Sequence, residues 1–420
     1  MGEATAGRDI DELFAEIAPL AERFHDAGYA IYLVGGIVRN HLANVHVDLD
    51  DVDLTTDAEP ADIKKLVGNW FDALWTQGER FGTIGGKVGD RVYEITTHRA
   101  EVYQSDSRKP SVEFSKAIAD DLSRRDFTVN AMAWTVPGRE LIDPYGGEAD
   151  LAAGILRTPL DADVSFSDDP LRMLRAARFL TRFGLVADPP LLESARSLAG
   201  RLDIVSVERI AAELEKLLVL PDPAVGLTFL LEHGLSAQFW PELDAGAIDR
   251  IGRITSHGAE VFDQRLAAGM VGIESSAVRA RLKHLRVSND RVKLVVRLAE
   301  SATSWSRRRS AHDDEAVRRL VARMGDSMPV LLSLGEQLRL PHAAELVVNL
   351  DRLGEAGELD DLGPELTGEQ LMELLDLGPG PMVGEVLAEL NEFRLVDGKH
   401  SRDVVEDHAR QFWRKRSSRE

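Results

Sequence analysis

Two aspartates, Asp51 and Asp53, stand two positions apart at the start of a run of strand-like residues. Side chains at positions i and i+2 of a strand point to the same face of a sheet. Two carboxylates held side by side repel each other unless a divalent cation lies between them, so this spacing suits Mg²⁺. The alternative interpretation is a solvated acidic loop, because Asp48 and Asp50 extend the same charge run.

A pair of glycines, Gly35 and Gly36, ends the β-type run AIYLVGG ahead of the aspartates, and Arg39 follows it. Glycine allows backbone N–H groups to approach a ligand closely, and a helix that begins after the turn favours an anion at its N-terminus. A plain connection between a strand and a helix would contain the same residues. Together with the aspartate pair, the glycines predict a phosphate cradle beside a metal site, which is the arrangement that nucleotidyl transfer needs.

Two further motifs carry charged residues on or near predicted strands. Glu94, in the run VYEITTHR, would supply a third carboxylate from a neighbouring strand, or it would face water. In DLSRRDFTVNAMAW, Arg125 and Asp126 would contact a triphosphate and a ribose hydroxyl, since arginine pairs bidentately with phosphate oxygens. The alternative for the second motif is a cluster of charges at the start of a helix.

Asp169 and Arg172, in DDPLRMLRAARF, are three positions apart and are therefore expected on one face of a helix. They would form either a surface ion pair of little energetic value or a pair that selects a base. A carboxylate accepts from an exocyclic amine and a guanidinium donates to the ring nitrogen beside it, and cytosine and adenine share that edge. Guanine and uracil present a carbonyl and a ring N–H there, so the pair would admit CTP and ATP and reject GTP and UTP.

These residues need a sheet with helices around it to position them. Up to about residue 150, short β-type runs alternate with polar turns and helical stretches, as in an α/β domain. From residue 151 the pattern becomes helical: DPLRMLRAARFLTRF has helical spacing and ends at Gly184, and SVERIAAELEKLLVL is amphipathic. Towards the C-terminus, LTGEQLMELLDLGPGPMVGEVLAELNEF predicts a helix, a Gly/Pro turn and a second helix.

The composition excludes several classes of protein. The 420 residues are 44% hydrophobic and include no cysteine, which predicts a globular protein without disulfides, cysteine-ligated zinc, iron–sulfur clusters or thiol nucleophiles. The formal net charge of −21 argues against nonspecific adhesion to nucleic acid, so a polyanion must be bound by a local basic patch or through metal. No apolar run approaches the length of a membrane span, and MGEATAGRDIDELF lacks the regions of a signal peptide, so we expect a cytoplasmic protein.

Taken in order, GGIVR, DVDLTTDA, EITTHR, DLSRRDFTVNAMA, DPLRMLRAARF and ERIAAELEKLL resemble the motifs of the bacterial class II tRNA nucleotidyltransferase and poly(A) polymerase family. The similarity is strong over residues 28 to 220 and resumes at TGEQLMELLDLGPGPMVGEVL. It implies an α+β fold, in which a polymerase-β-like nucleotidyltransferase head with a mixed sheet precedes an all-helical neck, body and tail. The implied boundaries are 1–150 for the head, 151–220 for the neck that selects the nucleotide, 221–350 for the body and 351–420 for the tail.

The resemblance also implies a role for each matching residue. Asp51 and Asp53 match the catalytic aspartates that bind metal, and Glu94 matches the position of a third catalytic carboxylate. Among the nucleotide-binding positions, Gly35, Gly36 and Arg39 match the triphosphate loop, and Arg125 and Asp126 match the motif that contacts the ribose. Asp169 and Arg172 match the protein template for the base. Arg175 and Arg178 would lie beside the triphosphate or shape the pocket wall.

The chain departs from the family pattern near the glycine turn. Asn40 stands where the family usually has aspartate, which removes one charge near the loop. The stretch NHLANVHVDLD is longer than usual and creates a competing aspartate pair, Asp48 and Asp50. We choose Asp51 and Asp53 because DLTTDA follows them in the expected register.

A second departure concerns the region after the neck, where many relatives carry a His-Asp phosphohydrolase domain. His25-Asp26 and His312-Asp313 are the only such dipeptides in this chain. The first precedes the predicted sheet, and the second lies in the polar string RRRSAHDDEA rather than in an apolar helix that would bury a metal. We therefore predict no phosphohydrolase activity.

A basic stretch offers a way for an acidic protein to hold RNA. Between residues 279 and 309, ten basic residues stand against two acidic ones. This stretch predicts a phosphate-binding face for the folded acceptor arm of tRNA, recognised by shape, and a solvated helix face is the alternative. Trp305 would either stack on a base or pack in the interior. The residues that we assign to RNA binding are Arg281, Lys283, Arg286, Arg307 and Arg308.

Together these expectations describe template-independent addition of CMP, CMP and AMP to the 3′ end of tRNA from CTP and ATP. Two Mg²⁺ ions held by Asp51 and Asp53 would activate the RNA 3′-hydroxyl for in-line attack and stabilise the departing pyrophosphate. We expect neither an obligate protein partner nor a membrane. A poly(A) polymerase and a CC-adding or A-adding enzyme share every motif and stay open, as do a non-catalytic RNA-binding protein and a metal-dependent hydrolase.

Overall fold

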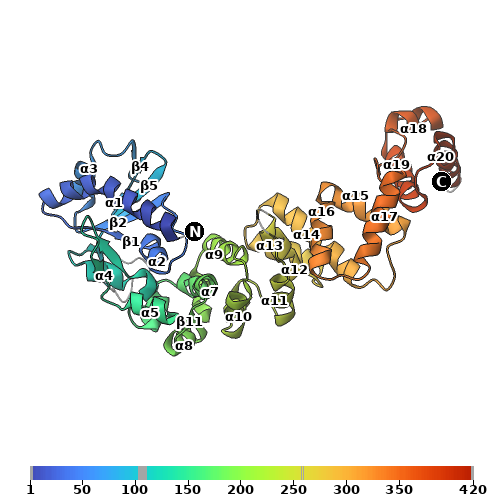
Figure 1. The fold of residues 1–420 in the computed structure, drawn as a ribbon. Helices are drawn as coiled ribbons and strands as arrows, with labels where there is room; N and C mark the ends of the chain where they lie inside the picture. Colours follow the sequence, from blue (N-terminus) through green and yellow to red (C-terminus); the bar gives the residue numbers. More distant parts are fainter. Residues whose placement is uncertain (1–2, 103–110, 257, 259, 418–420) are drawn as a thin grey trace. The chain divides into compact units, whose positions relative to one another are not determined.

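The computed structural model describes residues 3–102, 111–256, 258 and 260–417 (Figure 1). The chain divides into two compact units, Met1–Pro241 and Glu242–Glu420. Every strand in the described ranges belongs to the first unit, and the second is built from helices. The prediction of an α+β protein, with a mixed sheet at its N-terminus and helices after it, is therefore confirmed.

A seven-stranded sheet with the order β3-β4-β5-β2-β1-β8-β9 forms the centre of the first unit. Strands β2 and β5 are parallel, with Asp53 opposite Glu94, and the other neighbours are antiparallel, so the sheet is mixed. The strands are β1 (Ile31–Val34), β2 (Asp51–Thr56), β3 (Ala73–Trp75), β4 (Thr83–Val88), β5 (Arg91–Thr97), β8 (Ala133–Thr135) and β9 (Leu141–Ile142).

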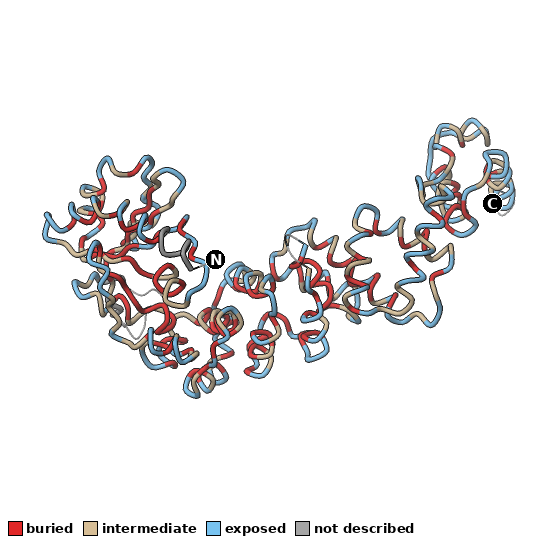
Figure 2. Tube along the Cα trace, in the orientation of Figure 1, coloured by how far each residue is buried: buried red, intermediate tan, exposed pale blue. Residues whose placement is uncertain are grey.

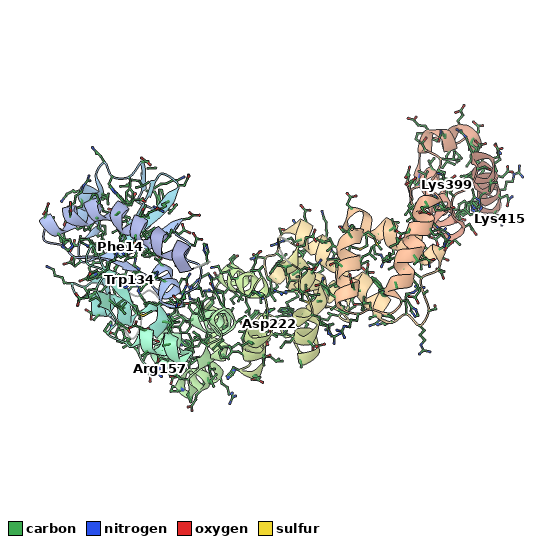
Figure 3. All side chains as sticks on the ribbon, viewed as in Figure 1. Phe14, Trp134, Arg157, Asp222, Lys399 and Lys415 are labelled. Atoms are coloured by element: carbon green, nitrogen blue, oxygen red, sulfur yellow. The ribbon has the colours of Figure 1, made fainter. Side chains whose placement is uncertain are left out.

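Two helices, α1 (Glu3–Asp26) and α3 (Pro60–Val67), bury one face of this sheet. Their apolar residues form one core with Val52 and Leu54 of β2, and the ring centroids of Phe14 in α1 and Trp134 in β8 lie 5.9 Å apart (Figure 3). Because side chains alternate along a strand, burying Val52 and Leu54 on this face leaves the residues between them on the other. The core thus directs the acidic residues of β2 away from α1.

Smaller elements accompany the sheet along the chain and lead into a helical region. A hairpin of β6 (Arg99–Val102) and β7 (Ser111–Phe114) follows β5, and a short parallel pair of β10 (Ile155–Leu156) and β11 (Val186–Ala187) interrupts the region expected to be wholly helical. The remaining elements of this unit are α2 (Gly36–Leu42), η1 (Glu79–Phe81), α4 (Ile118–Ser123), η2 (Thr128–Asn130), α5 (Gly147–Ala153), α6 (Ala162–Asp168), α7 (Leu171–Phe183), α8 (Pro189–Ser197), η3 (Ala199–Ile204), α9 (Val207–Leu218), α10 (Ala224–Glu232) and η4 (Ser236–Gln238).

Helix α7 is held between α9 and α10, and its inner residues are buried (Figure 2). It ends at Gly184, which has a φ of 62°, as the sequence predicts for a helix that stops in the left-handed region. Gly226 lets α10 approach closely, since a Cβ atom there would lie 2.5 Å from the carbonyl oxygen of Ala177. This packing fixes the position of the charged side chains that α7 carries.

The second unit consists of helices, and its last three helices enclose an apolar cluster of their own that includes Leu371, Val386 and Leu390. The helix–turn–helix predicted near the C-terminus is confirmed by α18 and α19. No helix in the described ranges has the length and apolar character needed to cross a membrane. The elements are α11 (Ala245–Gly252), α12 (Val261–Gly269), α13 (Ser275–His284), α14 (Asn289–Ser306), α15 (Asp314–Met324), η5 (Gly325–Ser327), α16 (Met328–Gln337), α17 (Ala343–Glu355), α18 (Gly368–Leu375), α19 (Pro381–Asp397) and α20 (Arg402–Ser417).

Candidate nucleotide-binding site

The glycine turn after β1 lies directly against an aspartate of β2. Gly35 has a φ of 80°, a conformation that favours glycine, and a Cβ atom at this position would lie 3.1 Å from Oδ2 of Asp53. Gly36 begins α2, and a Cβ atom at Gly36 would lie 3.4 Å from Nη2 of Arg39. A side chain at Gly35 would therefore crowd the Asp53 carboxylate.

Three acidic residues share the face of the sheet opposite α1. Asp51 and Asp53 alternate with buried residues of β2, and Glu94 lies beside Asp53 in the parallel register of β2 and β5. All three side chains are exposed, and none has a hydrogen-bond or ion-pair partner among the residues that the structure describes. Carboxylates without protein partners on one face are a donor set that fits a hard divalent cation.

The Asp53 carboxylate reaches solvent through the mouth of a cavity, yet protein surrounds it on most sides. Desolvation, with repulsion from Glu94 and Asp51 and against the attraction of Arg125, raises the pKa of Asp53 to about 6. A cation at this position would favour the charged form. In the described part of the chain, no three His, Cys, Asp or Glu side chains lie close enough together to hold a metal by themselves, so ligands from outside the protein would have to complete the coordination.

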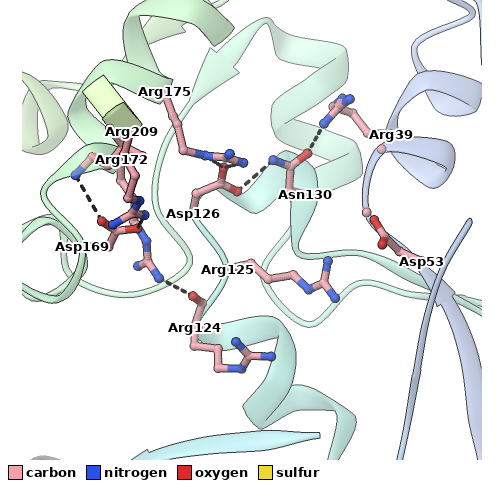
Figure 4. A pocket seen from close by; sticks show the side chains of 13 residues that line it. Arg39, Asp53, Arg124, Arg125, Asp126, Asn130, Asp169, Arg172, Arg175 and Arg209 are labelled. Carbon is pink, nitrogen blue, oxygen red and sulfur yellow. Dashed lines mark hydrogen bonds and ion pairs between the residues drawn. The ribbon is translucent and has the colours of Figure 1, made fainter. Parts of the chain in front are cut away.

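A cavity of about 390 Å³ lies between the glycine turn and helix α7 (Figure 4). Arg39 and Asp53 lie on one side of it, and Asp169, Arg172 and Arg209 lie on the other (Figure 4). Six arginines and three aspartates contribute to its wall, which favours an anionic ligand. The lining residues are Gly35, Gly36, Arg39, Asp53, Arg124, Arg125, Asp126, Asn130, Asp169, Leu171, Arg172, Arg175 and Arg209.

A chain of hydrogen bonds crosses the back of this cavity. Arg39 donates to Oδ1 of Asn130, and Nδ2 of Asn130 donates to Oδ1 of Asp126 at 2.8 Å (Figure 4). Nε of Arg175 donates to Oδ2 of Asp126 at 2.8 Å, and Glu213 of α9 lies 3.8 Å from the same guanidinium. Burial alone would raise the pKa of Asp126, but Arg175 and the other donors hold it below its usual value.

Arg178 does not line the cavity. Its Nε donates to Oε2 of Glu213 at 2.7 Å, and Glu213 is only 4% exposed. Arg178 therefore joins α7 to α9, and its predicted role at the triphosphate or the pocket wall stays a prediction. Asp51 and Glu94 are likewise outside the wall of the cavity, although they share the sheet face of Asp53.

Asp169 and Arg172 both line the cavity, but the expectation that they share one face of a helix is wrong. Asp169 precedes α7 in an extended conformation, with φ −135° and ψ 94°, because the residue before a proline is disfavoured in a helix. Its Oδ2 accepts from Arg209 of α9 at 2.8 Å. Arg172 donates to Oγ of Ser165 at 2.8 Å and to the carbonyl oxygen of Arg124 at 2.5 Å, so the two predicted partners are oriented separately.

The residues predicted to bind RNA all lie in the second unit and have mixed surroundings. Nε of Arg281 donates to Glu242 at 2.9 Å, and Arg308 donates to the carbonyl oxygens of Ser310 and Ala311. Lys283, Arg286 and Arg307 are exposed. Trp305 is 1% exposed and its Nε1 donates to the carbonyl oxygen of Pro341 at 2.7 Å, so it packs in the interior and does not present its ring to a base.

The two His-Asp dipeptides have local structural roles. Nε2 of His25 lies 2.9 Å from the carbonyl oxygen of Val136. His312 is buried against Trp305, and Asp313 caps α15 by accepting from the backbone N–H of Ala316 at 2.8 Å. The absence of phosphohydrolase activity stays a prediction.

Sequence reasoning missed four residues that organise the cavity. Asp121 is fully buried and forms ion pairs with Arg124 and Arg125, while Asn130, Arg209 and Glu213 supply the links described above. Asp121 and Asn130 lie in the motif DLSRRDFTVNAMA, and Arg209 and Glu213 lie in ERIAAELEKLL, so the motifs contained the signal. Sequence spacing did not reveal which side chains in these motifs would meet.

The chain resembles known proteins in both sequence and structure. Residues 31–157 match the family model of the poly A polymerase head domain, and residues 187–246 match the model described as a probable RNA- and SrmB-binding site of polymerase A. The CCA-adding enzyme of Streptococcus pneumoniae (strain CGSP14) is 30% identical over 415 residues, which cover 95% of this chain and 97% of the relative. That of Levilactobacillus brevis is 31% identical over 404 residues, covering 93% and 95%.

The crystal structure of the Bacillus stearothermophilus CCA-adding enzyme in complex with CTP superimposes with a TM-score of 0.70 at 26% sequence identity, and covers 97% of this chain and 99% of that one. Similarity to the curated relatives thus extends over nearly the whole length of both chains and includes both units. The chain belongs to the family of the CCA-adding enzymes, tRNA nucleotidyltransferases with a head domain of the poly(A) polymerase type.

Proposed function

We propose that this protein adds CMP, CMP and AMP to the 3′ end of tRNA, using CTP and ATP and releasing pyrophosphate. The observation that carries the proposal is the cavity in which the glycine turn, Asp53 and the charged residues of α7 converge, in a chain of the CCA-adding family. A relative of this family binds CTP in its crystal structure. The cavity of about 390 Å³ has an arginine-rich wall that complements a nucleoside triphosphate.

In this proposal, the triphosphate lies at the glycine turn. Gly35 and Gly36 allow its oxygens to approach the backbone, and Arg39, Arg125 and Arg175 neutralise its charge. Asp126 accepts from the ribose, while Asp51, Asp53 and Glu94 form the catalytic edge. Most of the rate enhancement then comes from positioning and charge neutralisation around the α-phosphorus.

The fit of the acidic residues supports a divalent cation at this edge, and we propose Mg²⁺. Asp51 and Asp53 would hold it, since their carboxylates share one sheet face and have no protein partners among the described residues. Bound there, Mg²⁺ would lower the pKa of the RNA 3′-hydroxyl and stabilise negative charge on the phosphates. Glu94 lies beside Asp53 in the parallel pairing of β2 and β5. It would orient a ligand of the bound metal.

Base selection is assigned to Asp169 and Arg172. Both line the end of the cavity opposite Asp53, and each is oriented by a partner of its own, Arg209 for Asp169 and Ser165 for Arg172. A carboxylate acceptor next to a guanidinium donor matches the edge shared by cytosine and adenine. Because Arg209 and Ser165 hold the two side chains separately, the Asp169 carboxylate and the Arg172 guanidinium would keep the spacing that the edge of the base requires.

We further propose the division into head (1–150), neck (151–220), body (221–350) and tail (351–420), and a cytoplasmic location. In the body, exposed Lys283, Arg286 and Arg307 would bind phosphates of the tRNA acceptor arm, together with Arg281 and Arg308. Arg281 already pairs with Glu242, which lowers its contribution.

One assay tests the proposed function directly. A tRNA ending at its discriminator base is incubated with labelled CTP alone, ATP alone or both, and the products are resolved at single-nucleotide length. The proposal predicts addition of two C residues with CTP, and one further A only when ATP is also present. An unlimited run of A on this tRNA or on a generic RNA would identify a poly(A) polymerase instead. Binding without any addition would identify an RNA-binding protein.

A further inference from the structure

The six arginines that line the cavity fall into two groups according to their protein partners. Four form ion pairs with aspartates: Arg124 and Arg125 with Asp121, Arg175 with Asp126, and Arg209 with Asp169. Arg39 and Arg172 bond to neutral oxygens instead, and neither forms an ion pair with any residue that the structure describes. Of these two, Arg39 is the one that lies at the glycine turn beside Asp53 (Figure 4).

Arg39 is held tightly although it lacks a carboxylate partner. Its Nε and Nη2 donate to Oδ1 of Asn40 at 3.1 and 2.7 Å, and its Nη1 donates to Oδ1 of Asn130. The guanidinium also lies 5.1 and 4.6 Å from the ring centroids of Phe179 and Phe183. These contacts use three of the five N–H groups, and the other two have no protein partner within the described ranges.

This arrangement keeps a full positive charge at a buried position. An amide oxygen accepts a hydrogen bond as a carboxylate does, but it carries no net charge and cancels none of the guanidinium charge. Burial, together with Arg182, Arg178 and Arg175 and against the opposing effect of Asp126, lowers the pKa of Arg39 to about 10. Arg39 is thus protonated at neutral pH in surroundings that would favour an added anion.

We propose that Asn40 is a positioning residue that fixes the Arg39 guanidinium without neutralising it, and so sets the affinity of the cavity for the polyphosphate of the incoming nucleotide. The inference rests on the proposed function and concerns a residue outside the cavity wall. An aspartate at position 40 would accept the same hydrogen bonds and form an ion pair with Arg39. The charge available to a ligand would then fall, although the hydrogen bonds that hold Arg39 would be kept and the bond from Nδ2 of Asn40 to the carbonyl oxygen of His46 would be lost.

The test is the substitution Asn40→Asp, with equilibrium binding measured for CTP, CDP and CMP and with thermal unfolding of the same samples. Charge compensation predicts a dissociation constant for CTP that is raised roughly tenfold, a smaller rise for CDP and almost none for CMP. The melting temperature should change little, because the ion pair gained with Arg39 offsets the lost hydrogen bond from Asn40 to the carbonyl oxygen of His46. In the addition assay, the KM for CTP and ATP should rise while kcat is nearly unchanged.

Asn69→Asp is the matched control, since it makes the same chemical change at an exposed residue away from the cavity and should leave all three dissociation constants unchanged.

If Asn40→Asp fails to fold, Asn130→Asp places a carboxylate on the other side of Arg39. That variant also faces Asp126, so it should melt earlier but show the same dependence on phosphate number. Equal losses for CTP and CMP, or no loss, in the folded variant would overturn the inference. A wild type that binds no CTP would instead refute the proposed function.

Discussion

The two units of this protein use their arginines in different ways. In the first unit, six arginines from α2, the end of α4, α7 and α9 line one cavity together with three aspartates. In the second unit, Arg318 and Arg394 are buried, and they bond to backbone carbonyls and to Glu358. A high count of basic residues in the sequence therefore does not identify a binding site. In the first unit, the candidate site is identified instead by charged side chains from several elements that line one cavity.

The largest effect should follow from loss of a carboxylate at the catalytic edge. Asp53→Ala should reduce kcat for nucleotide addition by at least about a thousandfold, because the proposed metal site loses a ligand. Desolvation raises the pKa of Asp53, so the folded protein disfavours the charged carboxylate. Removing this carboxylate should therefore not lower the melting temperature. Single-turnover addition and thermal unfolding measure the two outcomes. Full activity would refute the metal assignment, and Asp51→Ala provides a second test of it.

A buried arginine of the second unit should affect stability rather than nucleotide binding. Arg394 is 2% exposed and pairs with Glu358 and Glu365. Arg394→Met should lower the free energy of unfolding of this unit by about 1–3 kcal/mol, because Glu365 loses its ion pair and Glu358 keeps only the one with Arg318. The dissociation constant for CTP should not change. A weaker affinity for CTP in a folded variant would contradict the division of roles between the units.

The buried His312 adds a pH dependence to the stability of the second unit. Burial, helped by Arg308 and His342 and opposed by Asp313, lowers the pKa of His312 to about 4. The unfolded chain protonates this histidine near its ordinary pKa of about 6.5, so stability is complete above that value and is lost as the pH falls towards 4. At pH 5 the loss should reach about 2 kcal/mol.

Denaturant unfolding at pH 7.5 and pH 5 measures this loss, and His312→Gln is the comparison. The variant should lack the portion of the acid sensitivity that comes from His312. Identical pH dependence in the two proteins would show that His312 titrates in the same range in the folded and unfolded states.

Base choice should change when Asp169 is truncated. Asp169→Ala removes the acceptor for the exocyclic amine, so the preference for CTP over UTP, as a ratio of kcat/KM, should fall by roughly tenfold or more. Arg209 loses its partner in the same variant, so Arg209→Ala is the appropriate control for a change that acts only through packing. An unchanged ratio in Asp169→Ala would exclude this residue from base selection.

The smallest effect should come from the exposed cations of the second unit. Arg286→Ala combined with Arg307→Ala should raise the KM for tRNA by a few-fold, with no change in the KM for CTP. The salt dependence of tRNA binding should also become less steep, because fewer counterions are released. If tRNA binding and its salt dependence are unchanged, the basic stretch is a solvated surface. The arginines of the first unit would then bind a ligand, whereas those of this stretch would not.

Much of the first unit followed from local patterns. Alternation along β2 predicted that Asp51 and Asp53 share a face, and the buried Val52 and Leu54 confirm it. Gly184 predicted the end of α7 because a left-handed residue there costs least for glycine. In contrast, η2 (Thr128–Asn130) depends on distant partners, because Thr128 bonds to Asp150 and to the backbone of Arg157. Those partners are distant in sequence, so no local pattern could identify them.

The types of residue available for chemistry and their order could be taken from the sequence, and with them the family and the mixed sheet followed by helices. Which charges meet depends on tertiary packing. Asp169 was separated from Arg172 by Pro170 and paired with Arg209 of another helix, and Arg39 was placed between two neutral asparagines. Periodicity reports the direction of a side chain within its own element, whereas the charge left for a ligand depends on partners that packing brings from elsewhere in the chain.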